Sequence, residues 1–378
     1  MEDLIARTRA HPLIDLHLET RVVTSSGFAG SFTSTIEGHT GSRRDVDHGV
    51  TILAIGGQEY RGPEYGYGSD PRIVTQQEFE RLLASDDKPP DSVVMIQCVG
   101  PAERFCSRIC CTVAIKNALA LKERNPDAQV VVVYKDIRVY GFKERAYTEA
   151  RRRGVLFVRY EDGAPPQVSA NGRLAVLARD PALDRVLEIH PDLVVLSMPV
   201  VPRDDVREVA GMVKCATDAD GFFLEAHVKL RSVDFASDGI FMAGMAHYPK
   251  LIDETMIQAQ AAAARAARVL SRDSLLAGGQ VAVVDPQRCT GCLTCVRICP
   301  FSVPRIAPAL AGVGGLLGAA TIEAAVCRGC GTCVAECPAR AIELRHYTDA
   351  QFAAKVGALV GAPGIGPLSP AAAGRPVS

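Results

Sequence analysis

Twelve of the thirteen cysteines fall into three groups, and they are the residues with the clearest chemical potential. Two groups have the spacing C-x2-C-x2-C-x3-C-P, starting at Cys289 and Cys327. In two-cluster iron–sulfur domains, three cysteines of such a motif hold one [4Fe–4S] cluster and the fourth reaches the other cluster. A zinc ribbon needs only two C-x2-C pairs and leaves the other cysteines unexplained. The spacing therefore predicts one cluster on Cys289, Cys292, Cys295 and Cys337, and another on Cys327, Cys330, Cys333 and Cys299.

A third group follows an apolar run at residues 93–96 and precedes a helical apolar pattern. Dinucleotide-binding units carry a glycine fingerprint at such a strand–turn–helix. Helix N-termini stabilise thiolates, and four thiolates suffice for one [4Fe–4S] cluster. Buried thiols, a disulfide and structural zinc are the alternatives, although adjacent cysteines are awkward ligands for tetrahedral zinc. We expect a third cluster, and no NAD(P), at Cys98, Cys106, Cys110 and Cys111.

Composition narrows the cellular setting. Cys215 belongs to none of the three cysteine groups, and we predict that it is a small buried apolar residue rather than a metal ligand. Thirteen cysteines without a recognisable signal peptide indicate a reducing compartment. The net charge of −1 gives no reason to expect nucleic acid binding. Residues 306–326 are weakly polar, but they join the two cysteine motifs, so we predict no membrane segment.

The elements around the cysteines predict an α/β protein. Residues 91–199 alternate strands with helices, which indicates a parallel sheet. The strands are expected at 93–97, 129–134, 156–159 and 193–198, with a hairpin at 167–178 and helices near 106–123 and 143–153. Earlier in the chain we expect a helix at 2–9, strands at 13–23 and 32–36, a polar segment, a loop at 62–70 and a helix at 74–84.

Two further strands end in small residues. The first, at 49–57, ends in Ala54, Gly56 and Gly57; the second, within 238–246, contains Ala243 and Gly244 and precedes a helix at 255–270. Such strand ends let a backbone approach a dinucleotide closely. Many buried strands also end in glycine, so this pattern alone does not identify a ligand.

Together these segments resemble the A-type polypeptide of heterodisulfide reductases. The resemblance rests on C-x-n-C-S-R-x-C-C-x4-K at 98–116, the segments 220–227, 239–244 and 346–351, and the twin ferredoxin motifs. It implies a partial thioredoxin-reductase-like FAD/NAD(P)-binding fold with a C-terminal α+β bacterial-type 2[4Fe–4S] ferredoxin domain. The implied domains are a partial FAD-binding domain (1–90), an inserted Rossmann-like domain (91–199), the return of the FAD-binding domain (200–278), the ferredoxin domain (279–346), and a helix with a disordered tail (347–378).

The resemblance also implies a function. The chain would be an iron–sulfur flavoprotein subunit of a cytoplasmic multi-subunit complex, passing electrons between FAD and three [4Fe–4S] clusters; in that family the FAD can bifurcate electrons. Lys116 matches the lysine near the flavin N5 and is the implied catalytic residue, with an exposed helix lysine as the alternative. A flavin-free ferredoxin-type electron-transfer adaptor is the alternative function. The implied FAD contacts are Ala54, Gly56, Gly57, Lys116, Ala243, Gly244, Ile252, Asp253 and Gln258.

Three features depart from the family pattern. We find no N-terminal G-x-G-x-x-G turn; the nearest match, at 312–318, lies between the ferredoxin motifs and is not expected to follow a strand. Ala-Ile-Gly at 54–56 replaces the family's Ala-Thr-Gly, and the spacing from Cys98 to Cys106 is shorter than expected. We therefore predict a split subunit whose partner polypeptide carries the G-x-G-x-x-G half and shares the FAD. Other predicted partners are further heterodisulfide-reductase-like subunits, together with a ferredoxin or a hydrogenase- or dehydrogenase-type electron donor.

Overall fold

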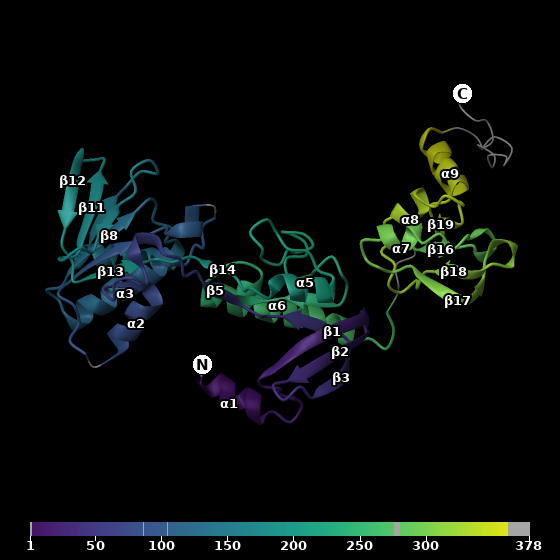
Figure 1. Ribbon diagram of the computed structural model, residues 1–378, viewed down its shortest axis with the longest axis horizontal. Helices are drawn as coiled ribbons and strands as arrows, with labels where there is room; N and C mark the ends of the chain where they lie inside the picture. Colours follow the sequence, from purple (N-terminus) through teal and green to yellow (C-terminus); the bar gives the residue numbers. More distant parts are fainter. Residues whose placement is uncertain (1, 86, 104, 276–279, 362–378) are drawn as a thin grey trace. The chain divides into compact units, whose positions relative to one another are not determined.

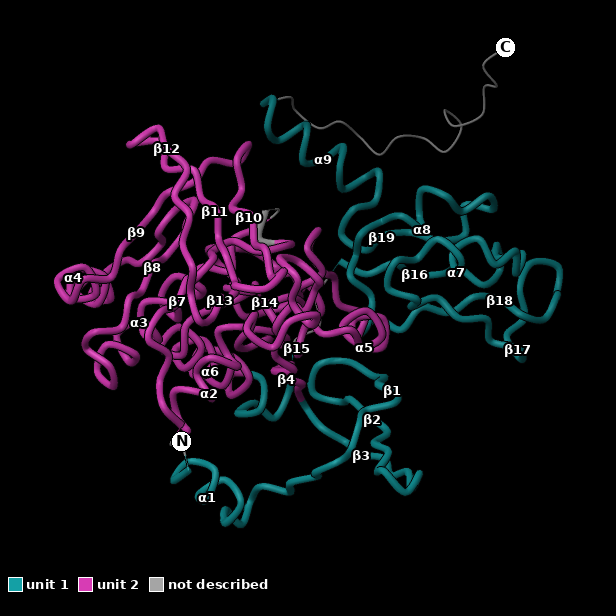
Figure 2. The backbone as a smooth tube through the Cα atoms, turned by 60° about the vertical axis from the view of Figure 1, so that its left-hand side comes forward, with its two compact units in different colours: residues 1–49, 269–378 teal, residues 50–268 magenta. Residues whose placement is uncertain are grey.

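The computed structural model describes residues 2–85, 87–103, 105–275 and 280–361. The chain folds as two compact units (Figure 2). The first unit comprises residues 1–49 and 269–378, and the second comprises residues 50–268. The predicted disordered tail after residue 361 lies outside the described residues.

The second unit is built on a parallel sheet with the strand order β6-β13-β7-β8-β9. Its strands β8 and β13 are labelled in Figure 1. The apolar residues 93–96 in β7 are each at most 1% exposed, as expected for a sheet that is covered on both faces. The parallel sheet predicted within 91–199 is thus confirmed, and β6 joins it from outside that range. The strands are β6 Ile73–Thr75, β7 Ser92–Ile96, β8 Gln129–Tyr134, β9 Leu156–Arg159 and β13 Leu193–Leu196.

Each face of this sheet packs against a different layer. On one face, helices α2, α3 and α4 contribute buried residues such as Phe79, Ile115 and Ala150. On the other face, buried residues such as Val176 come from a small antiparallel sheet with the order β10-β11-β12. The predicted hairpin is therefore part of a three-stranded sheet, whose third strand, β12, was not predicted. The elements are α2 Gln76–Ala84, α3 Cys110–Arg124, α4 Glu144–Arg152, β10 Gln167–Ser169, β11 Ala175–Asp180 and β12 Arg185–Ile189.

Two leucines in the parallel sheet offer a matched test of this core. Leu196 in β13 is 0% exposed, whereas Leu156 in β9 is 61% exposed. Leu196→Ala removes buried packing and leaves a cavity, so it should lower the free energy of unfolding by about 2–5 kcal/mol. Leu156→Ala removes the same atoms from the surface and should change it by about 0.5 kcal/mol or less. Urea denaturation followed by circular dichroism measures both, and equal losses would contradict this description of the core.

Two short strand pairs complete the sheets of the second unit. Strands β4 and β15 pair in parallel, and β5 pairs antiparallel with β14. The strand predicted at 49–57 is divided into β4 and β5 because Gly56 turns the chain with a φ of +77°. The elements are β4 Thr51–Leu53, β5 Gly57–Glu59, β14 Val200–Pro202, α5 Val206–Val213, β15 Ile240–Met242 and α6 Ile252–Leu270.

The first unit begins with helix α1 and an antiparallel sheet with the order β1-β2-β3. The strand predicted at 13–23 is wrong in its bounds, since β1 starts at Thr20. The polar segment that follows β2 contains β3, because its aspartates accept hydrogen bonds across the sheet: Thr33 donates to Asp47 and Thr35 to Asp45, both at 2.7 Å. The elements are α1 Glu2–Ala10, β1 Thr20–Phe28, β2 Ser31–Gly38 and β3 Arg43–His48.

The C-terminal part of the first unit carries the cysteine repeat between two antiparallel strand pairs, β16 with β19 and β17 with β18. Short helices α7 and α8 begin just before the third cysteine of each motif. The elements are β16 Ala282–Val284, α7 Thr294–Ile298, β17 Arg305–Ala311, β18 Leu317–Thr321, α8 Thr332–Ala335, β19 Ile342–Leu344 and α9 Asp349–Leu359.

The weakly polar run at 306–326 forms most of the β17–β18 pair. The glycine-rich segment 312–318 does follow a strand, contrary to expectation, but it leads into an antiparallel strand instead of a helix. A Cβ on Gly312 would lie 2.4 Å from the Cys289 carbonyl oxygen, so this glycine permits close approach to a cysteine loop. Across the described ranges, no helix has both the length and the apolar character required to cross a bilayer.

Candidate functional site

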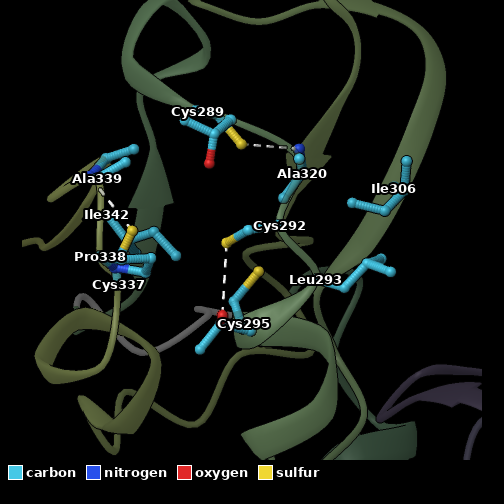
Figure 3. A pocket seen from close by; sticks show the side chains of 14 residues that line it. Cys289, Cys292, Leu293, Cys295, Ile306, Ala320, Cys337, Pro338, Ala339 and Ile342 are labelled. Atoms are coloured by element: carbon cyan, nitrogen blue, oxygen red, sulfur yellow. Dashed lines mark hydrogen bonds between the residues drawn. The ribbon is translucent and has the colours of Figure 1, made fainter.

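The two C-terminal cysteine motifs meet around two pockets. One pocket is lined by Cys289, Cys292 and Cys295 of the first motif and by Cys337 of the second (Figure 3). The other is lined by Cys327, Cys330 and Cys333 of the second motif and by Cys299 of the first. The fourth cysteine of each motif thus crosses to the other pocket, which is the grouping that the spacing predicts. Cluster binding itself stays a prediction.

Backbone amides donate hydrogen bonds to several of these sulfurs. The amide of Ala320 lies 3.3 Å from Cys289 Sγ, and that of Ala341 lies 3.3 Å from Cys337 Sγ. Cys327 Sγ accepts from the amide of Ala282, at 3.4 Å, and from that of Gly329, at 3.5 Å. Such donors stabilise negative charge on sulfur, and hydrogen bonds to the sulfurs also tune cluster potentials. They fit thiolate ligands better than inert buried thiols.

The electrostatic environments of the cysteines repeat between the pockets. Hydrogen bonding with Thr294 and Thr332, respectively, lowers the pKa values of the exposed thiols Cys292 and Cys330. In contrast, burial and the neighbouring thiols raise the pKa of Cys333 to about 11. A buried group of thiols loses its protons only when a cation compensates the charge, so this donor set fits a positively charged iron core.

The third cysteine group gathers at the carboxyl ends of the parallel strands. Cys98 follows β7 with a φ of +60°, and Cys110 and Cys111 are the first residues of α3. Cys111 Sγ lies 3.7 Å from the carbonyl oxygen of Asp136, which follows β8. Cys110 Sγ lies 3.7 Å from the carbonyl oxygen of Met198, which follows β13. Three strand ends therefore surround this turn, at the edge where α/β sheets bind ligands.

These four thiols interact with one another electrostatically. Burial and the other thiols of the group raise the pKa of Cys110 to about 12 and that of Cys111 to about 11. Burial also raises the pKa of Cys98, whereas Lys135 and Arg138 act to lower it. Cys98, Cys110 and Cys111 therefore favour the protonated form unless a metal supplies positive charge. All four are free thiols in the structure.

Structural zinc and a [4Fe–4S] cluster require different arrangements of four thiolates. Within the parts of the chain that the structure describes, no three or more His, Cys, Asp or Glu side chains are placed to hold one ion. In a [4Fe–4S] cluster each thiolate binds a different iron, so its four sulfurs lie farther apart than the ligands of one zinc ion.

The predicted flavin-facing turns lie at one sheet edge. Because β4 and β15 are parallel neighbours, the residues that follow them emerge together: the amide of Ala243 donates to the Leu53 carbonyl at 2.9 Å. Ala54 is exposed, whereas Ala243 and Gly244 are buried. A Cβ on Gly56 would meet nothing within 4 Å, which leaves this turn open to a ligand. A Cβ on Gly57 would meet Val200 at 2.7 Å, so Gly57 is also needed for the β5–β14 pair.

A series of hydrogen-bonded side chains next to the turn at Gly244 was not predicted from the sequence. Gln258 Oε1 accepts from the Gly244 amide at 2.8 Å, and Gln258 Nε2 lies 2.8 Å from His247 Nδ1. His247 Nε2 lies 2.9 Å from Glu225 Oε2. Lys250 donates to the carbonyl oxygens of Gly244 and Tyr248, and burial lowers its pKa to about 8. Gln258 therefore holds the turn at Gly244 in place, and no local sequence pattern reveals these partners.

The remaining predicted residues are dispersed over the second unit. Ile252 and Asp253 are exposed at the start of α6, and Asp253 pairs with Lys143 at 2.7 Å. Lys116 is half exposed on α3 and pairs with Glu80 of α2 at 2.6 Å. Cys215 is half buried after α5, and its thiol lies 3.6 Å from the Val213 carbonyl oxygen. Neither these positions nor the contacts assign a ligand to these residues.

Comparisons with known proteins concern both the C-terminal cysteine repeat and the chain as a whole. Residues 288–342 match the model of the 4Fe-4S dicluster domain family. The chain is 38% identical over 257 residues to the second A-type iron-sulfur subunit of the CoB–CoM heterodisulfide reductase of Methanopyrus kandleri, covering 63% of this chain and 39% of that protein. It is 35% identical over 281 residues to the A-type subunit of the H2:CoB–CoM heterodisulfide, ferredoxin reductase of Methanothermobacter thermautotrophicus, covering 68% of this chain and 42% of that protein. The predicted resemblance to the A-type polypeptides of heterodisulfide reductases is thus confirmed, and the chain spans about two fifths of these relatives' length.

Solved structures support the fold. The crystal structure of LpdA from Mycobacterium tuberculosis aligns with a TM-score of 0.50 and 16% identity, covering 75% of this chain and 56% of that protein. Thioredoxin reductase of T. acidophilum is also similar, with a TM-score of 0.47, 14% identity, and coverage of 71% of this chain and 78% of that protein. The predicted α/β class of the fold is therefore confirmed, with an overall similarity to LpdA, and a 4Fe-4S dicluster domain follows, as predicted.

Proposed function

We propose that this chain is the electron-transfer part of an oxidoreductase of the heterodisulfide-reductase type, an iron–sulfur flavoprotein that works within a multi-subunit complex. The observation that carries the proposal is the convergence of Cys98, Cys106, Cys110 and Cys111 at the edge of the parallel sheet. This cysteine turn is hydrogen-bonded to the segment that follows β15, since Tyr248 Oη donates to the Cys106 carbonyl at 3.0 Å. A cluster takes up one electron at a time while FAD holds two, so the pair can divide a two-electron exchange into single steps.

The proposal assigns particular residues to these groups. The three cysteine groups would hold three [4Fe–4S] clusters. The strand ends at Ala54, Gly56, Ala243 and Gly244 would lie against FAD, with Gln258 holding the second turn. The proposal includes the partners predicted above, among them a polypeptide that carries G-x-G-x-x-G. It also includes the capacity to bifurcate electrons. The names of the relatives include heterodisulfide and ferredoxin, which are the acceptors that we propose to test first.

One observation favours the alternative of a flavin-free electron-transfer adaptor. Among the described residues, the sheet that would hold the FAD consists of β4 and β15 alone. Acid release and chromatography of flavin from the assembled complex separate the two functions. About one FAD for each copy of this chain supports the flavoprotein, because its two strand ends would contribute to a single cofactor site. Full iron content without flavin would establish the adaptor instead.

Lys116 is proposed to act on the flavin through its charge. Its ion pair with Glu80 is half exposed, and such pairs contribute only about 0–1 kcal/mol, so the ammonium group is easily redirected toward a ligand. A nearby ammonium group stabilises the reduced flavin, which is more negative than the oxidised form. Lys116→Met should therefore make the flavin harder to reduce in the flavin-loaded complex, with unchanged iron content. Spectroscopic titration of the flavin measures the potential.

Lys122→Met provides the matched control for this prediction. Lys122 lies on the same helix but donates to the Pro126 carbonyl at the carboxyl end of α3. Its removal should leave the flavin potential unchanged. If the two variants behave alike, Lys116 is an ordinary surface lysine.

A further inference from the structure

Arg108 occupies an unusual position inside the third cysteine group. It lies between Cys106 and Cys110 in the sequence, and its φ of +60° is in the left-handed region that non-glycine residues rarely adopt. This conformation places its amide 3.3 Å from Cys106 Sγ. The backbone of Arg108 therefore already donates to one sulfur of the group.

The guanidinium of Arg108 is fixed at its outer end. Its Nη2 donates to Glu254 Oε2 at 3.2 Å and to the Pro249 carbonyl at 3.3 Å. Its Nη1 lies 3.4 Å from Tyr140 Oη, which in turn donates to Glu254 Oε1 at 3.2 Å. These partners belong to the segment after β15, the start of α6 and the loop after β8. Arg108 thus connects the cysteine turn to the elements that carry the predicted flavin contacts.

The inner nitrogen of the same guanidinium lacks a partner. Arg108 Nε is buried, and none of the residues that the structure describes accepts a hydrogen bond from it. A buried donor on a charged group requires an acceptor. Binding of a cluster would convert the thiols of Cys106 and Cys110, which lie two residues away on either side in the sequence, into anionic thiolates. A cluster sulfur or cysteine thiolate would satisfy this donor.

We propose that Arg108 is a positioning residue for the cluster held by Cys98, Cys106, Cys110 and Cys111, to which it donates through Nε while its outer nitrogens hold Glu254 and Pro249. The inference rests on the proposed function, because it requires the third cluster. Reduction adds one electron to the cluster and makes it more negative. The Arg108 cation stabilises the reduced form and raises the reduction potential. Glu254, as an anion on the same cation, has the opposite effect.

The test is a redox titration of the full chain, purified anaerobically and monitored by electron paramagnetic resonance. Comparison with the Cys110→Ser variant identifies the signal of the third cluster. Arg108→Gln should retain all three clusters and lower the potential of that cluster alone, with about a tenfold loss in its equilibrium constant for reduction, which is 59 mV for a one-electron couple. Glu254→Gln should shift the same signal to a higher potential. Opposite shifts from two partners of one ion pair are not expected from general loosening of the fold.

Two further variants separate the hydrogen bond from charge alone. Arg108→Lys keeps the charge but cannot bind Glu254 and donate to sulfur at the same time. It should therefore lower the reduction potential of the third cluster by less than Arg108→Gln. If Arg108→Gln loses the cluster, the potential measured in Arg108→Lys tests the inference. Arg138→Gln removes a guanidinium that is 56% exposed and paired with Asp136, so its shift should be smaller. An unchanged potential in Arg108→Gln, or an equal shift in Arg138→Gln, would overturn the inference. A third cluster missing from the wild-type chain would instead refute the proposed function.

Discussion

The anaerobically purified chain is expected to contain about twelve iron atoms, and the Cys110→Ser variant about eight. The reason is that the structure gathers three separate groups of four thiols, two around the pockets of the cysteine repeat and one at the edge of the parallel sheet. Cys110 belongs to the third group alone, and its loss leaves three ligands for that cluster. Iron and acid-labile sulfide analysis measures the content, and the ferredoxin-type signals should remain.

Cys215→Ser is the matched control for this experiment. Cys215 has the same chemistry, but it lines neither pocket, and its thiol lies near the Val213 carbonyl. This variant should keep the full iron content. If the wild-type chain holds only about eight irons, the third group is not a cluster site, and the proposed function is refuted in favour of a two-cluster protein.

The 378-residue chain expressed by itself is expected to retain little FAD, and a polypeptide that carries G-x-G-x-x-G should restore about one FAD for each chain. The pyrophosphate of FAD needs a glycine turn at a helix N-terminus. The described residues offer β4 and β15, whose carboxyl ends suit the other side of the cofactor. The glycine-rich segment 312–318 cannot supply the turn, because it joins two antiparallel strands.

The experiment compares three preparations: the chain alone, the chain with the added polypeptide in trans or fused ahead of it, and the chain with a polypeptide whose glycines are replaced by alanine. Only the second should bind FAD stoichiometrically, because a Cβ blocks the approach of the backbone to the pyrophosphate. Released flavin is measured by its absorbance and compared with the protein concentration. Tight binding of one FAD by the chain alone would refute the shared site.

The sequence predicted elements well where one physical signal dominates. Strands β8 and β9 have the predicted bounds because each is a short run of β-branched and other apolar residues. The fourth cysteines, Cys299 and Cys337, line the pockets that the spacing assigns to them. Strand β3 escaped prediction because its stability comes from cross-strand partners and not from an apolar pattern of its own.

Side chains that are coupled through tertiary structure could not be predicted. Helix α3 was expected near residue 106, but it starts at Cys110 because Arg108 adopts a left-handed conformation. The partners of Arg108 at Pro249 and Glu254 are distant in sequence, and so are those of His247 at Glu225 and Gln258. Ion pairs and hydrogen bonds of this kind leave no periodic pattern in a single sequence.

The parallel pairing of β4 with β15 has a consequence for the order in which the chain folds. Thr51 pairs with Ile240 and Leu53 with Met242, so the whole five-stranded sheet lies between the two partners in the sequence. Bringing such distant segments together costs conformational entropy, and contacts of high sequence separation form slowly. Folding of the intervening sheet first shortens the effective loop that remains to be closed. We expect this pair to form late, after the sheet that carries the third cysteine group.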